Sequence, residues 1–447
     1  MSNPISSSKK HLEQTLETAI VEVLTTNGGY QEIAPAEFHR QWAIIPKSVI
    51  AFLKSTQPEA WKKAETQYKD KTETEVVNRL RKELDQNGSL HVLRKGIKGV
   101  GIQFSMAFFK PETSFNPTLQ AKYDGNLLEV ARQVKYSDKN ENALDLVLFL
   151  NGIPVATAEL KNAFTGQTVE NAKKQYKFDR DAAEPIFRFK ERTLVHFVVD
   201  TDQVFLTTKL SGPSTRYLPF NLGNNMGAGN PVNPSGYKTA YLWEYVWAKD
   251  SWLDILGKYL HLQVEEEEIM GKKVRKESLI FPRFHQVDVV RKLSRHVREQ
   301  GAGHNYLVQH SAGSGKSNSI AWLAYRLSNL HNDKDEKVFD SVIVVTDRRV
   351  LDRQLQDTIY QFEHKMGVVE KIDKNSAQLG ESLKKGTNII ITTLQKFPMI
   401  VELAGTLPNR KYAVIVDEAH SSQSGEASRK LKMVLSNTTL EKAAEQE

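Results

Sequence analysis

Three polar side chains interrupt two apolar runs in the first half of the chain. Asp145 lies within Leu144–Leu150, and Glu159 and Lys161 close the run that begins at Ile153. Charges embedded in apolar strands need an ion-pair partner or a metal, because burying an unpaired charge is costly. Two carboxylates that face one point can hold Mg²⁺, and a nearby ammonium can orient water and stabilise charge on a phosphate. We therefore take these three as candidate catalytic residues, with both acids as metal ligands; an ordinary structural hairpin is the alternative.

A glycine-rich loop in the second half follows the short apolar run Tyr306–Val308, which we expect to be a strand. The candidate nucleotide-binding residues of the loop are Gly313, Ser314, Gly315, Lys316 and Ser317. The glycines let backbone N–H groups approach phosphate oxygens, Lys316 can reach the outer phosphates, and Ser317 can bind Mg²⁺. His310 stands where the common pattern of this loop has its first glycine.

An acidic pair follows a second apolar run. Tyr412–Val416 reads as a buried strand, and it ends in Asp417 and Glu418. Phosphoryl transfer from ATP requires a carboxylate for Mg²⁺ and one for the attacking water, and we assign these roles to Asp417 and Glu418, respectively. Exposed loop acids are the alternative. The two constellations together imply ATP and Mg²⁺ as cofactors.

The first constellation makes a geometric demand on its hairpin. A simple two-residue turn at Asn151–Gly152 would place Asp145 opposite Ala158, so that Asp145 and Glu159 would point to opposite faces. A one-residue offset brings the two acids to one face beside Lys161. We predict an irregular turn or a bulge in this hairpin, with a left-handed Gly152 as the device.

The elements that must position these residues suggest an α/β protein of two domains. Helical spacing over 11–24 and 71–84, with strand-like runs over 89–163 and 193–208, predicts a mixed domain over 1–262. Four consecutive glutamates and a basic cluster in 263–278 predict a charged linker. From 279 to 447, strands alternate with helices, which indicates a parallel sheet.

Composition narrows the class further. The chain has 447 residues, a formal charge of +7 and no cysteine, which favours a polyanionic partner and excludes disulfides and thiolate metal sites. The N-terminus lacks the apolar core of a signal peptide, and we find no apolar run long enough for a membrane span. We expect a soluble cytoplasmic protein.

The first constellation resembles the PD-(D/E)xK nucleases, and its neighbourhood Asn142–Asp145 and Ala158–Asn162 resembles the restriction (R) subunits of type I restriction-modification enzymes. The loop and the acidic pair, taken in order along the chain, resemble superfamily 2 helicases. This resemblance implies a nuclease-like α/β domain followed by a first RecA-like lobe, and the chain ends at Glu447 without room for a second lobe. It also implies double-stranded DNA as substrate, with methylase and specificity subunits as partners.

The same resemblance adds further candidates. It makes Gln286 the adenine-reading residue, and it suggests DNA-contacting or accessory roles for Glu17, Gln175, Tyr176, Arg180, Arg348 and Thr393. Related nucleases often have a Gln and a Tyr four residues apart, whereas here Gln175 is followed at once by Tyr176. Tyr176 and Arg180 could equally be plain surface residues, and Glu17, which we favour over Glu13, a solvated helix residue.

Two other functions fit the sequence. One is a helicase-like ATPase of another DNA defence or remodelling system, with an N-terminal domain that binds DNA without cutting it. The other is a non-catalytic assembly subunit in which the glycine-rich loop is a degenerate P-loop that serves for docking. The intact Lys316, Asp417 and Glu418 disfavour this second function.

Overall fold

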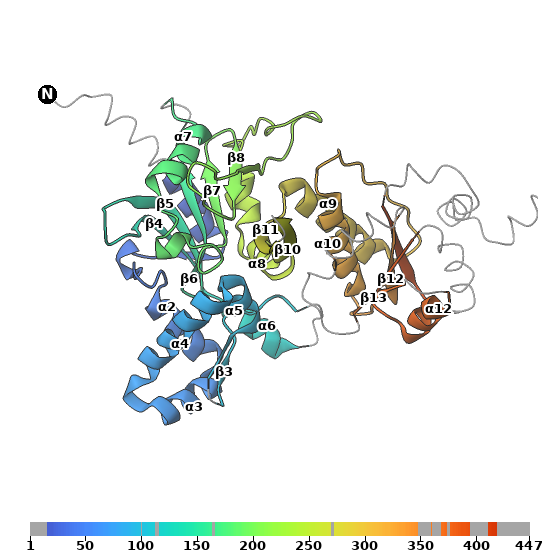
Figure 1. Ribbon diagram of the computed structural model, residues 1–447, viewed down its shortest axis with the longest axis horizontal. Helices are drawn as coiled ribbons and strands as arrows, with labels where there is room; N and C mark the ends of the chain where they lie inside the picture. Colours follow the sequence, from blue (N-terminus) through green and yellow to red (C-terminus); the bar gives the residue numbers. More distant parts are fainter. Residues whose placement is uncertain are drawn as a thin grey trace, which may run out of the picture. The chain divides into compact units, whose positions relative to one another are not determined.

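The computed structural model describes residues 16–99, 101–111, 116–162, 166–269, 272–346, 359, 368–372, 376–393 and 410–417. Within them the chain divides into a first compact unit that ends at Phe284 and a second that begins at His285. Both units combine helices with a sheet, as expected for the α/β class (Figure 1). The described part of the chain has no helix that is both long and apolar enough to cross a lipid bilayer.

The first unit is built on a mixed sheet with the strand order β1-β4-β5-β6-β7-β8-β9. Its strands are β1 (Tyr30–Glu32), β4 (Leu128–Lys135), β5 (Ala143–Leu150), β6 (Ile153–Leu160), β7 (Val195–Val199), β8 (Val204–Thr207) and β9 (Leu218–Pro219). Strands β5 and β6 lie in the middle, and every residue of β6 is buried. Its near-continuous apolar sequence fits a strand that is covered on both faces.

The same unit contains several helices. They run over residues 16–26 and over α2 (Pro46–Thr56), α3 (Pro58–Tyr68), α4 (Thr72–Asn87), α5 (Ser89–Lys95), α6 (Pro117–Asp124), α7 (Val169–Lys174) and α8 (Lys249–Lys258). Helix α7 packs on β6 and β7. Figure 1 shows α2 to α5 gathered together at one end of the unit. Two π-helical segments, Gln175–Asp179 and Leu242–Val246, and a small hairpin of β2 (Ile97–Lys98) and β3 (Gln103–Phe104) complete the unit.

The segment expected to be a linker is a regular hairpin. Strands β10 (His261–Ile269) and β11 (Lys272–Ile280) pair antiparallel, and the register sets Glu265 opposite Lys276 and Glu268 opposite Lys273. Opposite charges that face each other across a ladder stabilise it. The charge blocks at 263–278 therefore belong to the two strands of a hairpin in the first unit, and the expectation of a linker is corrected.

The second unit contains a sheet in which all the paired strands are parallel, as predicted. Its order is β13-β14-β12-β15, and its described elements are α9 (Phe284–Gln300), α10 (Lys316–Ser328), β12 (Ser341–Thr346), β13 (Val369–Lys371), α12 (Ser376–Lys385), β14 (Ile389–Thr393) and β15 (Tyr412–Val416). Helix α10 packs on β12, β14 and β15. The expected strand at Tyr306–Val308 is absent from this sheet: that segment is irregular, and Leu307 is 87% exposed.

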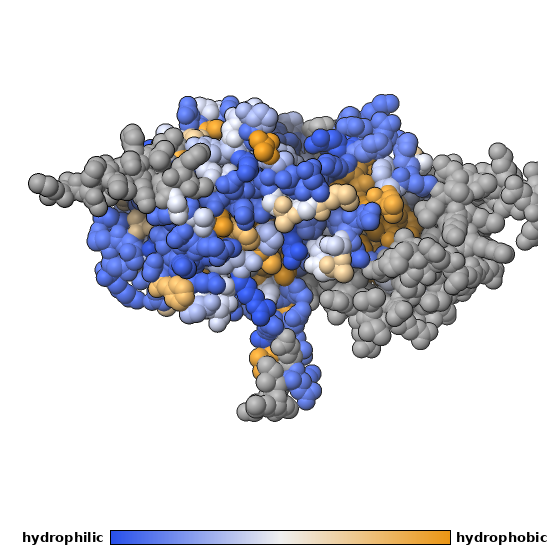
Figure 2. Space-filling view, turned by 90° about the horizontal axis from the view of Figure 1, so that it is seen from above, coloured by the Kyte–Doolittle hydropathy of each residue, from blue (hydrophilic) through white to orange (hydrophobic). Residues whose placement is uncertain are grey.

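On the face seen in Figure 2, hydrophilic residues predominate among the described residues, and apolar residues form separate patches. The apolar side chains gather inside each unit: one buried cluster joins β4, β5 and α7, and another joins β12, β14 and α12. These two cores hold the strands on which the candidate residues lie.

Candidate nuclease and nucleotide-binding sites

The β5–β6 hairpin has the one-residue offset that the two acids require. Leu150 pairs with Ile153 and Phe149 with Pro154, but Leu148 then pairs with Ala156, which leaves Val155 as an extra residue. From this bulge onward Leu146 faces Ala158, so Asp145 comes level with Glu159. Partners across a ladder share a face. The prediction that both acids lie on one face is therefore confirmed.

The bulge itself lies elsewhere than predicted. Asn151 and Gly152 both have positive φ, of 54° and 80°, and form a regular two-residue turn. Pro154 explains the position of the offset: it has no N–H to donate, and in the interior of a sheet a proline is found essentially at bulges. Placing the bulge at Gly152 was wrong, and Pro154 was the signal in the sequence that could have located it.

Glu159 is the most deeply buried of the three candidates, with an exposed fraction of 0%. Its Oε1 atom accepts two hydrogen bonds from Arg180, one from Nε at 2.9 Å and one from Nη2 at 2.7 Å. Its Oε2 atom is buried and has no hydrogen-bond partner among the residues that the structure describes. Burial raises the pKa of Glu159 to about 8, and the charge of Asp145 adds to the rise, while Arg180 and Lys161 act in the opposite direction.

Asp145 is held by the strand opposite. Its Oδ2 accepts a hydrogen bond from the Leu160 amide at 2.7 Å, and its Oδ1 lies 3.4 Å from the Nε2 of Gln133. Gln133 occupies the position of β4 opposite Asp145, where the regular pairing of the two strands is interrupted and its φ is 51°. Lys161 follows β6 directly and is 8% exposed.

Glu17 extends this cluster from the N-terminal helix. Its Oε2 accepts a hydrogen bond at 2.8 Å from the same Gln133 amide group that lies beside Asp145. Glu17 is 8% exposed, and burial raises its pKa, with a further rise from Asp145. The alternative of a solvated helix residue is thereby excluded for Glu17. Glu13 lies outside the described residues.

These oxygens fit a divalent cation. The buried Oε2 atom of Glu159 lacks a partner, and Mg²⁺ prefers oxygen ligands, commonly taking one or two carboxylates and completing its shell with water or phosphate. Among the residues that the structure describes, no group of three or more acidic, histidine or cysteine side chains forms a metal site.

The structure corrects the roles suggested for the segment after Lys161. Tyr176 is fully buried in the core beneath α7, and its hydroxyl hydrogen-bonds to that of Thr157 at 2.7 Å. Arg180 is 7% exposed and is bonded to Glu159. Neither is a surface residue, and Tyr176 has no surface to offer to DNA. Gln175 lies at the start of a π-helix, with its side-chain oxygen buried and without a partner.

The nucleotide-binding loop has the backbone that its glycines allow. Gly313 and Gly315 have φ of 72° and 81°, and Gly315 is the N-cap of α10, which starts at Lys316 and places Ser317 in its first turn. Helix N-termini of this kind bind phosphate. The side chain of Ser314 is buried, with an Oγ atom that lacks a partner.

Gln286 braces this loop from α9. Its Nε2 donates to the Gly315 carbonyl at 2.8 Å and approaches that of Ser314 at 3.3 Å, and a Cβ at Gly315 would lie 2.6 Å from the same nitrogen. Its side chain is 3% exposed. The role of Gln286 as the adenine-reading residue stays a prediction. His310 packs edge-on against His285, with 5.0 Å between ring centroids, and burial lowers its pKa.

Two predicted residues, Thr393 and Asp417, lie at the carboxyl ends of the strands on either side of β12. Thr346 and Thr393 are ladder partners at the ends of β12 and β14, and Asp417 follows β15 and donates its amide to Val345 at 2.9 Å. Ligands of parallel α/β sheets bind at this edge. Glu418 and Arg348 lie outside the described residues.

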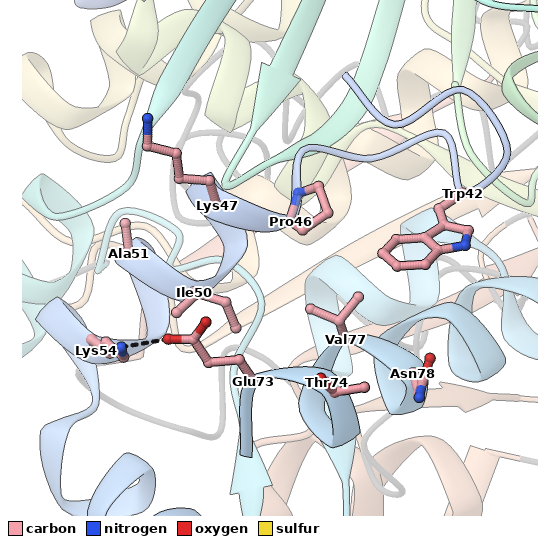
Figure 3. Close-up of a pocket in the computed structure, with 10 residues that line it drawn as sticks. All are labelled: Trp42, Pro46, Lys47, Ile50, Ala51, Lys54, Glu73, Thr74, Val77 and Asn78. Atoms are coloured by element: carbon pink, nitrogen blue, oxygen red, sulfur yellow. Dashed lines mark hydrogen bonds and ion pairs between the residues drawn. The ribbon is translucent and has the colours of Figure 1, made fainter. Parts of the chain in front are cut away.

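A separate pocket of about 560 Å³ lies between α2 and α4 (Figure 3). Its lining contains none of the predicted site residues, and includes the apolar side chains of Trp42, Ile50 and Val77. Two charged groups at its rim, Lys54 and Glu73, form an ion pair of 2.7 Å with each other. The pocket therefore offers no group that is poised for the chemistry described above.

Two family models match the chain. Residues 10–215 match the N terminus of the type I restriction enzyme R protein, and residues 285–440 match the SWI2/SNF2 ATPase family. The second match makes the second unit a RecA-like ATPase lobe. The two matches agree with the division of the fold into two units, because one covers most of the first unit and the other begins where the second unit begins.

Curated relatives agree with these matches. A putative type I restriction enzyme endonuclease subunit of Methanocaldococcus jannaschii is 25% identical over 406 residues, which cover 83% of this chain and 36% of the relative. A type I restriction enzyme endonuclease subunit of Staphylococcus aureus strain COL is 24% identical, over 70% of this chain and 31% of the relative. The chain thus spans about a third of the length of these relatives. With a match to the R-protein N terminus followed by a match to the SWI2/SNF2 ATPase family, the chain is similar to the endonuclease subunits of type I restriction enzymes.

Proposed function

We propose that the chain is the nuclease and motor part of an ATP-dependent type I restriction endonuclease. It cleaves double-stranded DNA with Mg²⁺ and couples ATP hydrolysis to DNA translocation. The observation that carries the nuclease half is the buried, unpartnered Oε2 of Glu159, which lies on the same face of the sheet as Asp145. The RecA-like lobe with its glycine loop supports the motor half.

In the nuclease site, Oδ1 of Asp145, which lies beside Gln133, and Oε2 of Glu159 would hold the cation. Mg²⁺ supplies, when bound, Lewis-acid stabilisation of the charge that develops on the phosphate. Lys161 follows Glu159 on the same face of the strand, where its ammonium can orient a water molecule and stabilise the same charge. Glu17, joined to Asp145 through Gln133, adds negative potential that favours cation binding.

In the ATPase site, the loop from Gly313 to Ser317 would cradle the phosphates at the start of α10. Lys316 neutralises their charge, Ser317 and Asp417 would hold Mg²⁺, and Glu418 would orient the attacking water. Gln286 keeps the loop in shape through its bonds to Ser314 and Gly315. We propose Thr393 as a DNA contact because it ends β14 at the ligand-binding edge of the sheet, and Arg348 because it comes shortly after β12 in the sequence.

The partners follow from the proposed activity. The relatives are named as subunits of type I restriction enzymes. We propose that this chain likewise assembles with a methylase subunit and with a specificity subunit that selects the DNA, in the cytoplasm where that DNA lies. The net charge of +7 suits a DNA-binding protein.

A plasmid assay tests the nuclease half. Supercoiled plasmid and ATP are incubated with the chain, alone and together with its candidate methylase and specificity subunits, in Mg²⁺ or in EDTA. We expect cleavage in Mg²⁺ and none in EDTA. Cleavage should be lost in Asp145→Ala, Glu159→Ala and Lys161→Ala. ATP hydrolysis should be retained in these variants, because the two sites lie in different units.

The matched control is Glu141→Ala, which removes an exposed acid that is ion-paired with Lys135 shortly before β5. It should cut like the parent protein. DNA binding without cleavage under all conditions would favour the alternative of a helicase-like ATPase with a non-cleaving DNA-binding domain. Loss of folding in all three site variants would favour a purely structural hairpin.

A further inference from the structure

Arg180 contacts Glu159 in an unusual way. Both hydrogen bonds that its guanidinium donates to Glu159 go to one carboxylate oxygen, Oε1, at 2.9 and 2.7 Å. Arginine and a carboxylate frequently pair as two parallel bonds, one to each oxygen. Here the second oxygen, Oε2, is left buried and without any partner.

The guanidinium is fixed from other sides as well. Its Nη2 also donates to the Ala143 carbonyl at 2.8 Å, at the first residue of β5, and its Nη1 lies 3.4 Å from the Tyr136 hydroxyl. The Tyr136 ring lies beneath it, with 5.4 Å between Cζ and the ring centroid. These contacts hold Arg180 where it follows the π-helix Gln175–Asp179. The position of the charge is thus set by the scaffold and does not depend on Glu159 alone.

This arrangement is a poor device for stability. Removing an arginine and a glutamate from water costs more free energy than an incompletely satisfied pair returns, and apolar replacements are often as stable or more stable. A buried carboxylate oxygen without a partner adds to that cost. A role in function accounts for the pair better than a role in folding.

We propose that Arg180 is a positioning residue for the cation site. It anchors Oε1 of Glu159 and thereby turns Oε2 toward the place where the cation binds, beside Asp145. This inference rests on the proposed nuclease function, and it replaces the DNA-contacting role that the sequence suggested for Arg180.

The test measures cation binding and DNA binding separately. Mn²⁺ affinity is measured by calorimetry on the full chain without nucleotide, DNA affinity is measured in EDTA, and Mg²⁺-dependent plasmid cleavage is followed in parallel. In Arg180→Gln we expect Mn²⁺ affinity to fall about 10- to 100-fold, as for other residues that orient metal ligands. DNA affinity in EDTA and its salt dependence should stay unchanged.

Two further variants make the result specific. Arg192→Gln removes another buried arginine, 4% exposed and paired with Asp85 at 2.8 Å, which contacts none of the candidate nuclease residues. It should lower stability without changing Mn²⁺ affinity. Arg180→Lys keeps the charge but lacks the planar guanidinium that donates two hydrogen bonds to Oε1 of Glu159. Its Mn²⁺ affinity should therefore lie between those of the parent and Arg180→Gln.

Each outcome decides the proposal. Unchanged Mn²⁺ affinity in Arg180→Gln overturns it, and a loss of DNA affinity in EDTA with Mn²⁺ affinity retained would make Arg180 a DNA contact instead. If Arg180→Gln does not fold, Arg180→Lys decides, and parental Mn²⁺ affinity in that variant overturns the proposal. If the parent protein neither binds Mn²⁺ nor cuts DNA, the nuclease function itself is wrong. If the parent does both and Arg180→Gln behaves like the parent, only the role of Arg180 is wrong.

Discussion

The Asp145 carboxylate accepts a hydrogen bond from the main-chain N–H of Leu160 at 2.7 Å, across the hairpin from its own strand. One oxygen of this side chain, Oδ2, therefore has a structural task, and the other, Oδ1, which lies 3.4 Å from the Nε2 of Gln133, is the one that we assign to the cation. The two tasks can be separated by choice of substitution.

Asp145→Asn should lose plasmid cleavage yet remain folded, because its amide oxygen can still accept the bond from Leu160. Asp145→Ala leaves that buried N–H without a partner, which costs about 1–3 kcal/mol. Urea unfolding of both variants, beside the cleavage assay, measures the difference. Equal stability of the two variants would show that the bond to Leu160 contributes nothing.

Gly152 offers a test of the hairpin turn. Its φ is +80°, and a Cβ there would lie 2.5 Å from the Ile45 carbonyl oxygen and 2.9 Å from the Val49 nitrogen. Gly166 is the matched control, because its φ is +74° and a Cβ at that position would meet nothing within 4 Å. Gly166→Ala should cost only the backbone penalty of about 1–2 kcal/mol.

Gly152→Ala should cost more than its control by about 1–3 kcal/mol, since the clash is with backbone atoms that cannot easily move. The unfolding free energies of the two variants are compared by urea titration. Equal losses would contradict the close packing of the turn against α2.

His196 should make the protein sensitive to acid. It is buried, its Nδ1 lies 2.7 Å from the Thr157 hydroxyl, and burial lowers its pKa to about 3 from the ordinary 6.5. As the pH falls below 6.5, His196 binds a proton in the unfolded chain but stays neutral in the folded one. The free energy of unfolding therefore decreases progressively between pH 6.5 and about 3.

His196→Asn keeps a polar group near Thr157 and removes the titration. The parent protein should therefore lose more unfolding free energy than His196→Asn when the pH is lowered from about 7 to about 5. Denaturant titrations at the two pH values measure this. Parallel losses in both proteins would show that His196 takes up its proton as readily in the folded state as in the unfolded one.

Lys316 is the test of the nucleotide site. Lys316→Ala removes a charge-assisted contact to the outer phosphates, and we expect affinity for a non-hydrolysable ATP analogue to fall at least about tenfold. Lys385→Ala, at the exposed end of α12, removes the same charge from the same unit and should bind like the parent. Calorimetry that gives equal affinities for all three proteins would refute the role of Lys316.

The hairpin shows how far the sequence determines the site. The positions of Asp145 and Glu159 were enough to require an offset, because side chains alternate along a strand. The place of the offset depends on Pro154, whose missing N–H has consequences only once β6 is known to pair on both sides. Sheet order comes from long-range packing, which local patterns do not contain.

Burial of single polar residues was harder to foresee. Tyr176 and Arg180 lie in a segment with lysines and an exposed Phe178, and such a composition is typical of a surface. Their burial depends on partners far away in the sequence, Thr157 and Glu159, which approach only after the sheet forms. The charged hairpin β10–β11 was missed for the same reason, because its glutamates and lysines neutralise each other across strands and not along the chain.

Because of the extra residue at Val155, whether Asp145 and Glu159 share a face depends on the number of residues between them and on the presence of the bulge. Deleting Val155 would restore an unbroken ladder and leave Glu159 level with Asp145, because the pairs on either side of the bulge would stay as they are. Deleting one residue of β6 beyond the bulge, with the bulge retained, would instead carry Glu159 to the far side of the sheet from Asp145, although every side chain of the motif would remain in the sequence. A homologous sequence with an odd change in length between the two acids would therefore have to gain or lose one irregularity to keep the acids on a common side.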